Sequence, residues 1–322
     1  MKDKALFIIN SPFQGLCMLE AIRYFDIKDY DVILREDSIE KNNAMLEKLF
    51  QDQSIKYHRV KINHIIKDVL LNIRRISTKY TRFFIGDYYS GGICAYSMSL
   101  FLAARYAEIT YLDDGAQTFR AFSTPPYPRF KSKRLLYLVR AYEFLNFYKR
   151  ISSNNFFTIF NVSSNKYNVY HNDLSLLKEK LLKGKVEGSF IIGTNSSSLP
   201  LNEDYLLLLE RVINRLRKES EEITYCPHRR DKNIKKVLDF CRNNDVKIFE
   251  TEVSVEYDFI ERHINPKHVI GFGSSALFSL KALYPDATIE NVRVELTDKS
   301  HQQRYERNYR KMKEEGINTI CI

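Results

Sequence analysis

The stretch Ala5-Leu6-Phe7-Ile8-Ile9-Asn10-Ser11-Pro12-Phe13-Gln14 places a short apolar run ahead of a small polar loop. An apolar run of this length, bounded by turn residues, is typical of a buried strand. Similar runs recur along the chain, and a helix-length stretch follows almost every one of them. Strands that alternate with helices at this spacing predict an α/β fold, with parallel sheets covered by helices on both faces.

The alternation runs in two blocks with an irregular region between them. In the first block we expect strands at 5–9, 31–34, 55–60, 82–86 and 108–112, with helices near 14–25, 39–51, 62–77 and 91–107. In the second block we expect strands at 189–193, 223–226, 247–250, 268–272 and 287–292, with helices near 202–219, 232–243, 254–263, 275–283 and 299–316. A proline-rich loop, a basic aromatic helix at 133–150 and an Asn/Ser-rich stretch at 152–173 separate the blocks.

This pattern predicts two Rossmann-like domains that face a central cleft. The N-terminal domain is expected over residues 1–155, a linker region over 156–187 and the C-terminal domain over 188–322. The last helix is expected to pack back on the N-terminal domain. Ligands bind such sheets at the carboxyl ends of the strands, so candidate site residues are sought there.

Composition and charge limit the class of protein. The 322 residues are 44% hydrophobic and 28% charged, which excludes a disordered or fibrous chain. Fifty Lys and Arg against 40 Asp and Glu give a net charge of +10, which favours anionic partners such as nucleotides, phosphosugars, lipid headgroups or nucleic acid. The five cysteines form no CxxC pair, so we expect reduced thiols in a cytoplasmic protein. No secretory or membrane-spanning segment is expected, because the apolar runs are too short or interrupted.

Polar residues follow two strands of the first block. Asn10, Ser11 and Gln14 come after the first strand, where they could either line a substrate or begin a helix. Asp113-Asp114-Gly115 follows the strand at 108–112 and could supply a general base or form a plain turn. The dinucleotide fingerprint GxGxxG is absent after the first strand, which argues against a dehydrogenase.

The strand ends of the second block carry groups suited to phosphate. Pro227-His228-Arg229-Arg230 offers two guanidinium groups and a histidine, unless it is a solvated basic turn. Gly273-Ser274-Ser275 precedes a helix, where it could bind phosphate or serve as an ordinary cap. Glu256 could accept hydrogen bonds from a ribose diol or interact with the dipole of its own helix.

Together these motifs resemble those of bacterial sialyltransferases. The likeness is greatest to glycosyltransferase family 52, the lipooligosaccharide sialyltransferase group, with motif kinship to bacterial polysialyltransferases. Asp113-Asp114-Gly115 is similar to the acidic-acidic-Gly motif, Ser274-Ser275 to the Ser-Ser motif, and the opening strand with Ser11–Gln14 to the start of that family. Pro227–Arg230 stands at the His-Pro-type motif, but here the proline precedes the histidine. Ser254-Val255-Glu256 likewise replaces a Pro-x-Glu.

The resemblance implies a GT-B fold and an inverting, metal-independent transfer without a cofactor. The donor would be a CMP-activated nonulosonic acid such as CMP-Neu5Ac, and the acceptor a hydroxyl of a surface glycan such as lipooligosaccharide or capsule. Asp114 would be the general base and His228 would protonate or hydrogen-bond the departing phosphate. The other implied donor-side residues are Ser274 and Ser275 at the phosphate, Glu256 at the ribose, and Arg229 and Gly273 beside them. The implied acceptor-side residues are Asn10, Ser11, Gln14, Asp113 and Gly115.

Other hypotheses concern partners and rival functions. The basic helix at 133–150 is either a peripheral contact with the inner face of the cytoplasmic membrane or a core helix with a solvated basic face. A homodimer is a further hypothesis. A GT-B transferase that uses a UDP-hexose is the alternative enzyme. A nucleic-acid-binding protein is the rival from another class, but the basic residues are dispersed and no RRM, KH or zinc-finger signature is found.

Overall fold

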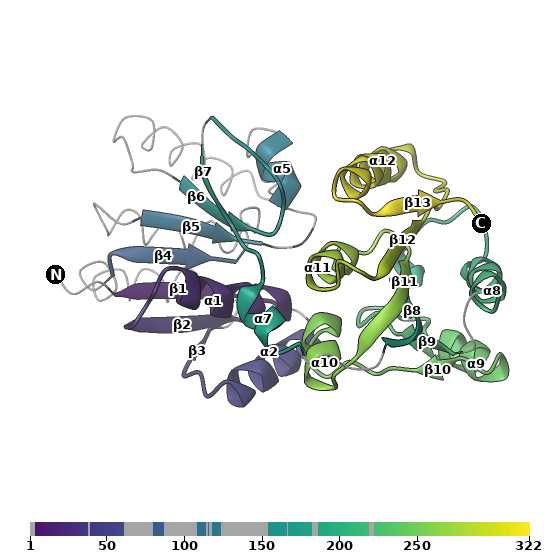
Figure 1. The fold of residues 1–322 in the computed structure, drawn as a ribbon, viewed down its shortest axis with the longest axis horizontal. Coiled ribbons are helices and arrows are strands. Elements are labelled where there is room, and N and C mark those ends of the chain that lie inside the picture. Colours follow the sequence, from purple (N-terminus) through teal and green to yellow (C-terminus); the bar gives the residue numbers. More distant parts are fainter. Residues whose placement is uncertain are drawn as a thin grey trace. The chain divides into compact units, whose positions relative to one another are not determined.

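The chain forms two compact units, Met1–Leu176 and Leu177–Ile322. The computed structural model describes residues 4–37, 39–60, 80–86, 108–113, 115, 118–123, 154–165, 167–181, 186–218 and 222–322. The units divide within the 156–187 range that was expected to be a linker. Figure 1 shows a sheet with flanking helices in each unit.

The described strands of the first unit form a seven-stranded parallel sheet in the order β3-β2-β1-β4-β5-β6-β7. The strands are β1 (Ala5–Ile9), β2 (Tyr30–Arg35), β3 (His58–Val60), β4 (Arg82–Ile85), β5 (Glu108–Leu112), β6 (Asn154–Thr158) and β7 (Asn168–His171). The described helices are α1 (Pro12–Tyr24), α2 (Glu40–Asp52), α5 (Thr118–Ser123) and α7 (Ser175–Glu179). All five residues of β1 are buried, as expected for a central strand covered on both faces.

The second unit has a six-stranded parallel sheet in the order β10-β9-β8-β11-β12-β13. The strands are β8 (Val186–Ile192), β9 (Ile223–Cys226), β10 (Lys247–Ile248), β11 (Asn265–Gly271), β12 (Thr288–Val292) and β13 (Asn318–Ile320). The helices are α8 (Tyr205–Leu216), α9 (Ile234–Asn243), α10 (Val255–Glu261), α11 (Ala276–Leu283) and α12 (Lys299–Glu314), with a short 3₁₀ turn η2 (Ser196–Ser198). Helices α8 and α9 cover one face of this sheet, and α10 and α11 the other (Figure 1).

Helix α8 shows how sequence periodicity builds the second core. Asp204 caps its N-terminus by accepting a hydrogen bond from the Leu206 backbone N–H at 2.8 Å. The buried residues of the helix are Tyr205, Leu208, Leu209, Val212, Ile213 and Leu216, which recur at the spacing of one helical face. This face packs on strand residues that include Ile191, Tyr225 and Ile270.

Strands β6, β7 and β13 were not expected from the sequence. Strand β6 begins Asn-Asn, and asparagine is a poor strand former, so its stretch was interpreted as irregular. In the fold Asn155 is buried and its amide is satisfied across the sheet: it donates to Glu108 of β5 and accepts from Asn168 of β7. Cross-strand hydrogen bonds therefore outweigh local propensity here.

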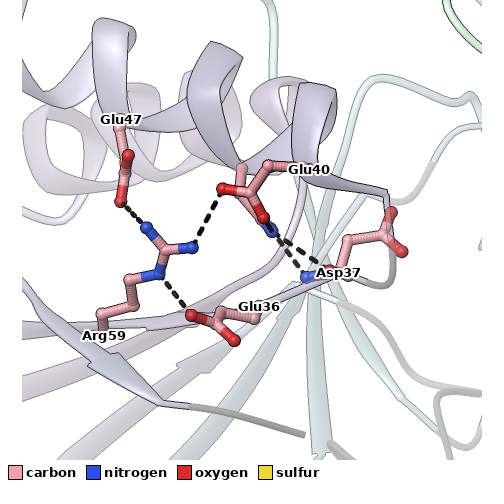
Figure 2. Close-up of polar contacts among 6 residues, drawn as sticks. Glu36, Asp37, Glu40, Glu47 and Arg59 are labelled. Atoms are coloured by element: carbon pink, nitrogen blue, oxygen red, sulfur yellow. Dashed lines mark hydrogen bonds and ion pairs between the residues drawn. The ribbon is translucent and has the colours of Figure 1, made fainter.

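A polar cluster fixes β2 and the edge strand β3 to α2 (Figure 2). The Arg59 guanidinium on β3 pairs with Glu36, which follows β2, and with Glu47 at 2.8 Å and Glu40 at 3.2 Å on α2. The adjoining loop is also held, because the Asp37 backbone N–H donates to Asn43 Oδ1 at 2.7 Å. The connection after β2 is thus tied down at the carboxyl edge of the first sheet.

Helix α12 belongs to the second unit and packs on other residues of that unit. Its residues Tyr309 and Met312 are buried, and the Tyr309 hydroxyl accepts a hydrogen bond from the Val294 backbone N–H at 3.1 Å. The expected return of this helix to the N-terminal domain stays a prediction. The expected helices at 62–77, 91–107 and 133–150 lie outside the described residues. Within the part of the chain that the structure describes, none of the helices combines the length and apolar character that crossing a bilayer requires.

Candidate functional site

The strand order of each sheet defines a switch point where the direction of winding reverses. It lies between β1 and β4 in the first sheet and between β8 and β11 in the second. In open parallel sheets ligands bind outside the carboxyl ends of the two strands at this point. The loops after β1, β4, β8 and β11 are therefore the first places to look for a site.

The loop after β1 is held by a capping arrangement. Ser11 is the N-cap of α1 and its hydroxyl accepts from the Gln14 backbone N–H at 3.4 Å. Gln14 Oε1 accepts in return from the Asn10 backbone N–H at 2.9 Å, one residue before the N-cap whose own N–H a capping box would use. Gln14 is fully buried against Gly86, where an added Cβ would lie 2.2 Å from Gln14 Oε1. The structure thus places Gln14 in the interior rather than on an acceptor-facing surface, while Asn10 and Ser11 stay partly exposed.

Asp113 and Gly115 stand on either side of the predicted base. Asp113 is fully buried, and its carboxylate accepts from the Thr158 hydroxyl at 2.6 Å and the Ile159 backbone N–H at 2.7 Å. It therefore joins the ends of β5 and β6. Asp113 was expected from the sequence to lie on the acceptor side of a site, whereas the structure buries its side chain. Gly115 has φ +57°, the left-handed conformation that favours glycine in a turn. Asp114, predicted to be the general base, lies outside the described residues.

His228 lies directly after β9, in the loop leading to α9. Its Nδ1 accepts a hydrogen bond from the Arg230 backbone N–H at 3.2 Å, so in the neutral ring Nε2 carries the proton. Burial, followed by the charges of Arg229 and Arg230, lowers the pKa of His228 to about 4, against a smaller opposing effect of Asp231. The free protein therefore presents a neutral imidazole that can donate a hydrogen bond from Nε2.

The loop after β11 forms the start of α11. Gly273 adopts φ +73°, and its N–H donates to Oδ1 of the buried Asn291 at 2.6 Å. The Ser274 hydroxyl accepts from the Ala276 N–H at 3.3 Å, whereas the exposed N-cap residue Ser275 makes no capping bond through its side chain. A hydroxyl at the positive end of a helix is well placed to bind an anion.

Glu256 lies next to this helix start, but deeper. It is 5% exposed in the first turn of α10 and accepts a hydrogen bond from the Ser279 hydroxyl of α11. Ser279 is one helical turn beyond Ser275. The structure therefore brings Glu256 close to the Ser-Ser start while placing it beneath the surface, where the predicted ribose contact would use the remaining capacity of its carboxylate.

The two phosphate-directed motifs lie on either side of one strand. Strand β8 pairs with β9 on one side and with β11 on the other. Neighbouring strands are about 4.8 Å apart, so the His228 loop and the Ser274-Ser275 loop begin about 10 Å from one another. Side chains that extend from both loops over the end of β8 could therefore reach one phosphate group. No group of three His, Cys, Asp or Glu side chains in the described ranges is arranged to hold a metal ion.

The loop between these motifs was missed by the sequence interpretation. It follows β8 and reads Gly193-Thr194-Asn195-Ser196-Ser197-Ser198. Its hydroxyls and backbone contact Asp231, a buried residue at the end of the His228 turn. A run of small hydroxyl and amide residues at the end of a buried strand was the available signal.

Solved structures share this two-sheet organisation. An α/β-galactoside α-2,3-sialyltransferase from Photobacterium phosphoreum aligns with a TM-score of 0.58 at 11% identity, covering 99% of this chain and 98% of that chain. The chain has the GT-B fold. The predicted architecture of two Rossmann-like domains is thus confirmed, whereas the central cleft between them stays a prediction.

Two further GT-B neighbours differ in the nucleotide they were solved with. A 2,6-sialyltransferase from a Photobacterium species, with CMP and lactose, aligns with a TM-score of 0.54 at 12% identity, covering 98% of this chain and 78% of that chain. A UDP-GlcNAc 2-epimerase from Methanocaldococcus jannaschii, with UDP-GlcNAc and UDP, gives 0.54 at 12% identity, with 99% and 89% covered. No protein-family model and no curated protein matches the chain. Bacterial sialyltransferases are thus among the structural neighbours, and membership of family 52 stays a prediction.

Gly273→Ala should destabilise the protein more than Gly316→Ala. Both glycines have left-handed φ values, +73° and +74°, so both substitutions carry the same backbone cost of about 1–2 kcal/mol. At Gly273 the new Cβ would also lie 2.5 Å from Tyr305 Cε1, whereas at Gly316 the nearest atom is 3.9 Å away. We expect the clash to add about 1–3 kcal/mol in denaturant unfolding. Equal losses for the two variants would contradict the packing of Tyr305 on Gly273.

His228 should titrate well below a free histidine. Its ring signals in NMR spectra of the ligand-free protein should show a midpoint near pH 4, and Arg229→Ala should raise that midpoint. Because the unfolded chain binds this proton near pH 6.5 and the folded chain does not, His228 should lower stability as the pH falls from about 6.5 towards 4. A midpoint near 6.5 would show that His228 is neither buried nor influenced by the arginines.

Proposed function

We propose that this protein is an inverting GT-B glycosyltransferase that moves sialic acid, or a related nonulosonic acid, from a CMP-sugar to a hydroxyl of a surface glycan such as lipooligosaccharide or capsule. The observation that carries the proposal is the placement of His228 and of Ser274-Ser275 at the ends of the two strands that flank β8. These motifs are 46 positions apart in the sequence, counting from 228 to 274, and the sheet brings them to one edge.

The second unit supplies the groups that a nucleotide phosphate requires. Ser275 offers a hydroxyl at the N-terminus of α11, and the helix dipole favours negative charge there. On the other side of β8, Arg229 and the Nε2 proton of His228 would face the same phosphate. The CMP-bound neighbour and the sialyltransferase motifs in this chain support CMP as the nucleotide.

The chemistry needs one displacement. The acceptor hydroxyl oxygen forms a bond to the anomeric carbon of the donor sugar while the bond from that carbon to the phosphate oxygen breaks. Asp114 would take the hydroxyl proton, and CMP would leave with the bonding electron pair. An attack opposite the leaving group inverts the anomeric centre without a covalent enzyme intermediate.

His228 would act on the leaving group, and its starting charge matters. A neutral imidazole donates a hydrogen bond without adding charge to an already basic turn. When a phosphate anion binds, its negative charge offsets the positive charges of Arg229 and Arg230 and raises the pKa of His228. The higher pKa favours proton transfer as negative charge develops on the leaving oxygen. Hydrogen bonding would thus precede any protonation.

The acceptor side of the proposal depends on the first unit. Asp114 would stand beside the buried Asp113, whose bonds to β6 give that strand end a rigid base. Asn10 and Ser11 are the remaining partly exposed candidates there. Contact with an anionic membrane through 133–150, a homodimer, metal independence and a cytoplasmic location stay predictions.

Release of CMP from CMP-Neu5Ac tests the function directly. With lactose as acceptor and EDTA present, we expect turnover, and we expect Asp114→Ala and His228→Ala to reduce kcat by about 10²- to 10⁴-fold each, the usual effect of losing a general acid or base. His171→Ala is a matched control, because His171 is exposed at the end of β7 and has no proposed role.

Three results would contradict the proposal. Absence of both CMP release and calorimetric CMP binding would show that the donor assignment is wrong. Turnover of UDP-hexoses in the same assay would support the alternative enzyme. Loss of activity in EDTA that is restored by a divalent cation would show that the transfer requires a metal.

A further inference from the structure

Asp231 is a buried carboxylate that no role discussed above uses. It is 6% exposed and lies three residues after His228, at the end of the same turn. Burying a carboxylate is costly unless hydrogen bonds satisfy it. The groups that satisfy Asp231 therefore show what it is built to hold.

Its hydrogen bonds come mainly from a different loop. The Ser196 hydroxyl donates to its carboxylate, at 3.0 Å from Oδ1 and 2.9 Å from Oδ2. The Ser197 backbone N–H donates to Oδ1 at 3.2 Å, and the Asn233 backbone N–H donates to Oδ1 at 3.1 Å. Asp231 thus connects the loop after β8 with the first turn leading to α9.

Another hydrogen bond between these loops has its donor in the loop before α9 and its acceptor in the loop after β8. The Lys232 backbone N–H donates to the Ser197 hydroxyl oxygen at 3.2 Å, and that hydroxyl donates to Asn195 Oδ1 at 2.7 Å. Within the turn itself, the Asp231 N–H donates to the His228 carbonyl at 3.1 Å. A shift of either loop would break several of these bonds together.

Asp231 also carries charge next to His228. The charged groups that act on the imidazole are Arg229 and Arg230, which oppose its protonation, and Asp231, which favours it. The side chain can therefore influence His228 in two separable ways, through the geometry of the turn and through its negative charge.

We propose that Asp231 is the positioning residue of the donor site: it locks the β8–α8 loop to the His228 turn and offsets the charges of Arg229 and Arg230. This inference rests on the proposed function, in which His228 and the loop after β8 contact the nucleotide. Asp231 itself touches no reacting atom. Its role is to keep His228 Nε2 directed at the phosphate.

Two substitutions separate charge from geometry. In Asp231→Asn, Oδ1 still accepts from the Ser197 and Asn233 N–H groups while Nδ2 can donate to the Ser196 hydroxyl, so the turn is kept and the charge is lost. The NMR midpoint of His228 should then fall below the wild-type value. Asp231→Ala removes both the charge and the lock. Burial is the largest cause of the low pKa of His228 and the charge of Asp231 the smallest, so freeing the turn should outweigh the lost charge and raise the midpoint towards 6.5.

Binding of CMP provides the second readout, measured by calorimetry on the full chain. We expect Asp231→Ala and Ser196→Ala to weaken CMP binding, because the loops that contact the nucleotide lose hydrogen bonds that hold them in place. For Asp231→Ala we expect about a tenfold rise in Kd, which corresponds to about 1.4 kcal/mol. Asp231→Asn should keep Kd within about threefold, because its geometry is retained. If Asp231→Ala does not fold, the Asn and Ser196 variants decide.

Glu20→Gln is the matched control. Glu20 is also a buried carboxylate, 2% exposed, and accepts a hydrogen bond from the Leu176 backbone N–H at 3.0 Å, but it lies on α1 in the first unit and has no proposed role in the donor site. It should change neither the His228 midpoint nor CMP affinity. Unchanged His228 titration in both Asp231 variants would overturn the inference. Failure of the wild type to bind CMP would instead contradict the proposed function, because the titration requires no ligand.

Discussion

The pairing of β8 with β11 is the constraint on which the second unit depends. Strand β8 is the first of its sheet in the chain and β11 the fourth, so their parallel ladder, from Asn265 opposite Val186 to Gly271 opposite Ile192, joins two halves wound in opposite directions. Because both strands end at the same edge, the loops that follow them emerge side by side. Strand β9 on the other side of β8 adds the His228 turn to the same edge.

The carboxyl edge of the second sheet is held by buried polar groups rather than by apolar packing alone. Asn291 fixes the N–H of Gly273, Asp231 fixes the loop after β8, and Glu256 is tied to α11 through Ser279. Each is a buried polar side chain satisfied by a neighbouring loop or helix. Such bonds restrict loops that would otherwise move, and a restricted loop can orient a ligand without the entropic cost of ordering on binding.

The turn after β9 carries a local excess of positive charge, because Arg229, Arg230 and Lys232 stand beside a single carboxylate, Asp231. The net charge of +10 favours anionic ligands in general, but it does not identify the residues that would bind them. The turn containing Arg229 and Arg230 is where charge and burial act on one titratable side chain, and they lower the pKa of His228. Two arginines next to a neutral histidine favour the binding of a phosphate. In the proposed function, the bound phosphate would then raise the pKa of the histidine.

The sequence predicted the fold class and most strands because apolar runs and turn residues follow directly from local patterns. It missed β6, since Asn155 is stabilised by Glu108 and Asn168, which are distant in the chain. It located His228, Ser274 and Ser275 correctly at strand ends. It could not distinguish Asp113, whose carboxylate accepts hydrogen bonds from Thr158 and Ile159, from a residue that faces a ligand. Asp231 was overlooked for the same reason: its partners Ser196 and Ser197 are 35 and 34 positions away, and only tertiary structure brings them together.

The central claim is that the edge formed by the ends of β8, β9 and β11 binds the nucleotide phosphate. Hydrogen–deuterium exchange of the full chain with and without CMP tests it most directly, with cytidine as the ligand that lacks the phosphate. The account predicts that CMP slows exchange in peptides spanning 193–198, 227–233 and 273–277, and that cytidine slows it much less. Slower exchange confined to other segments, or none in these three loops at saturating CMP, would contradict it.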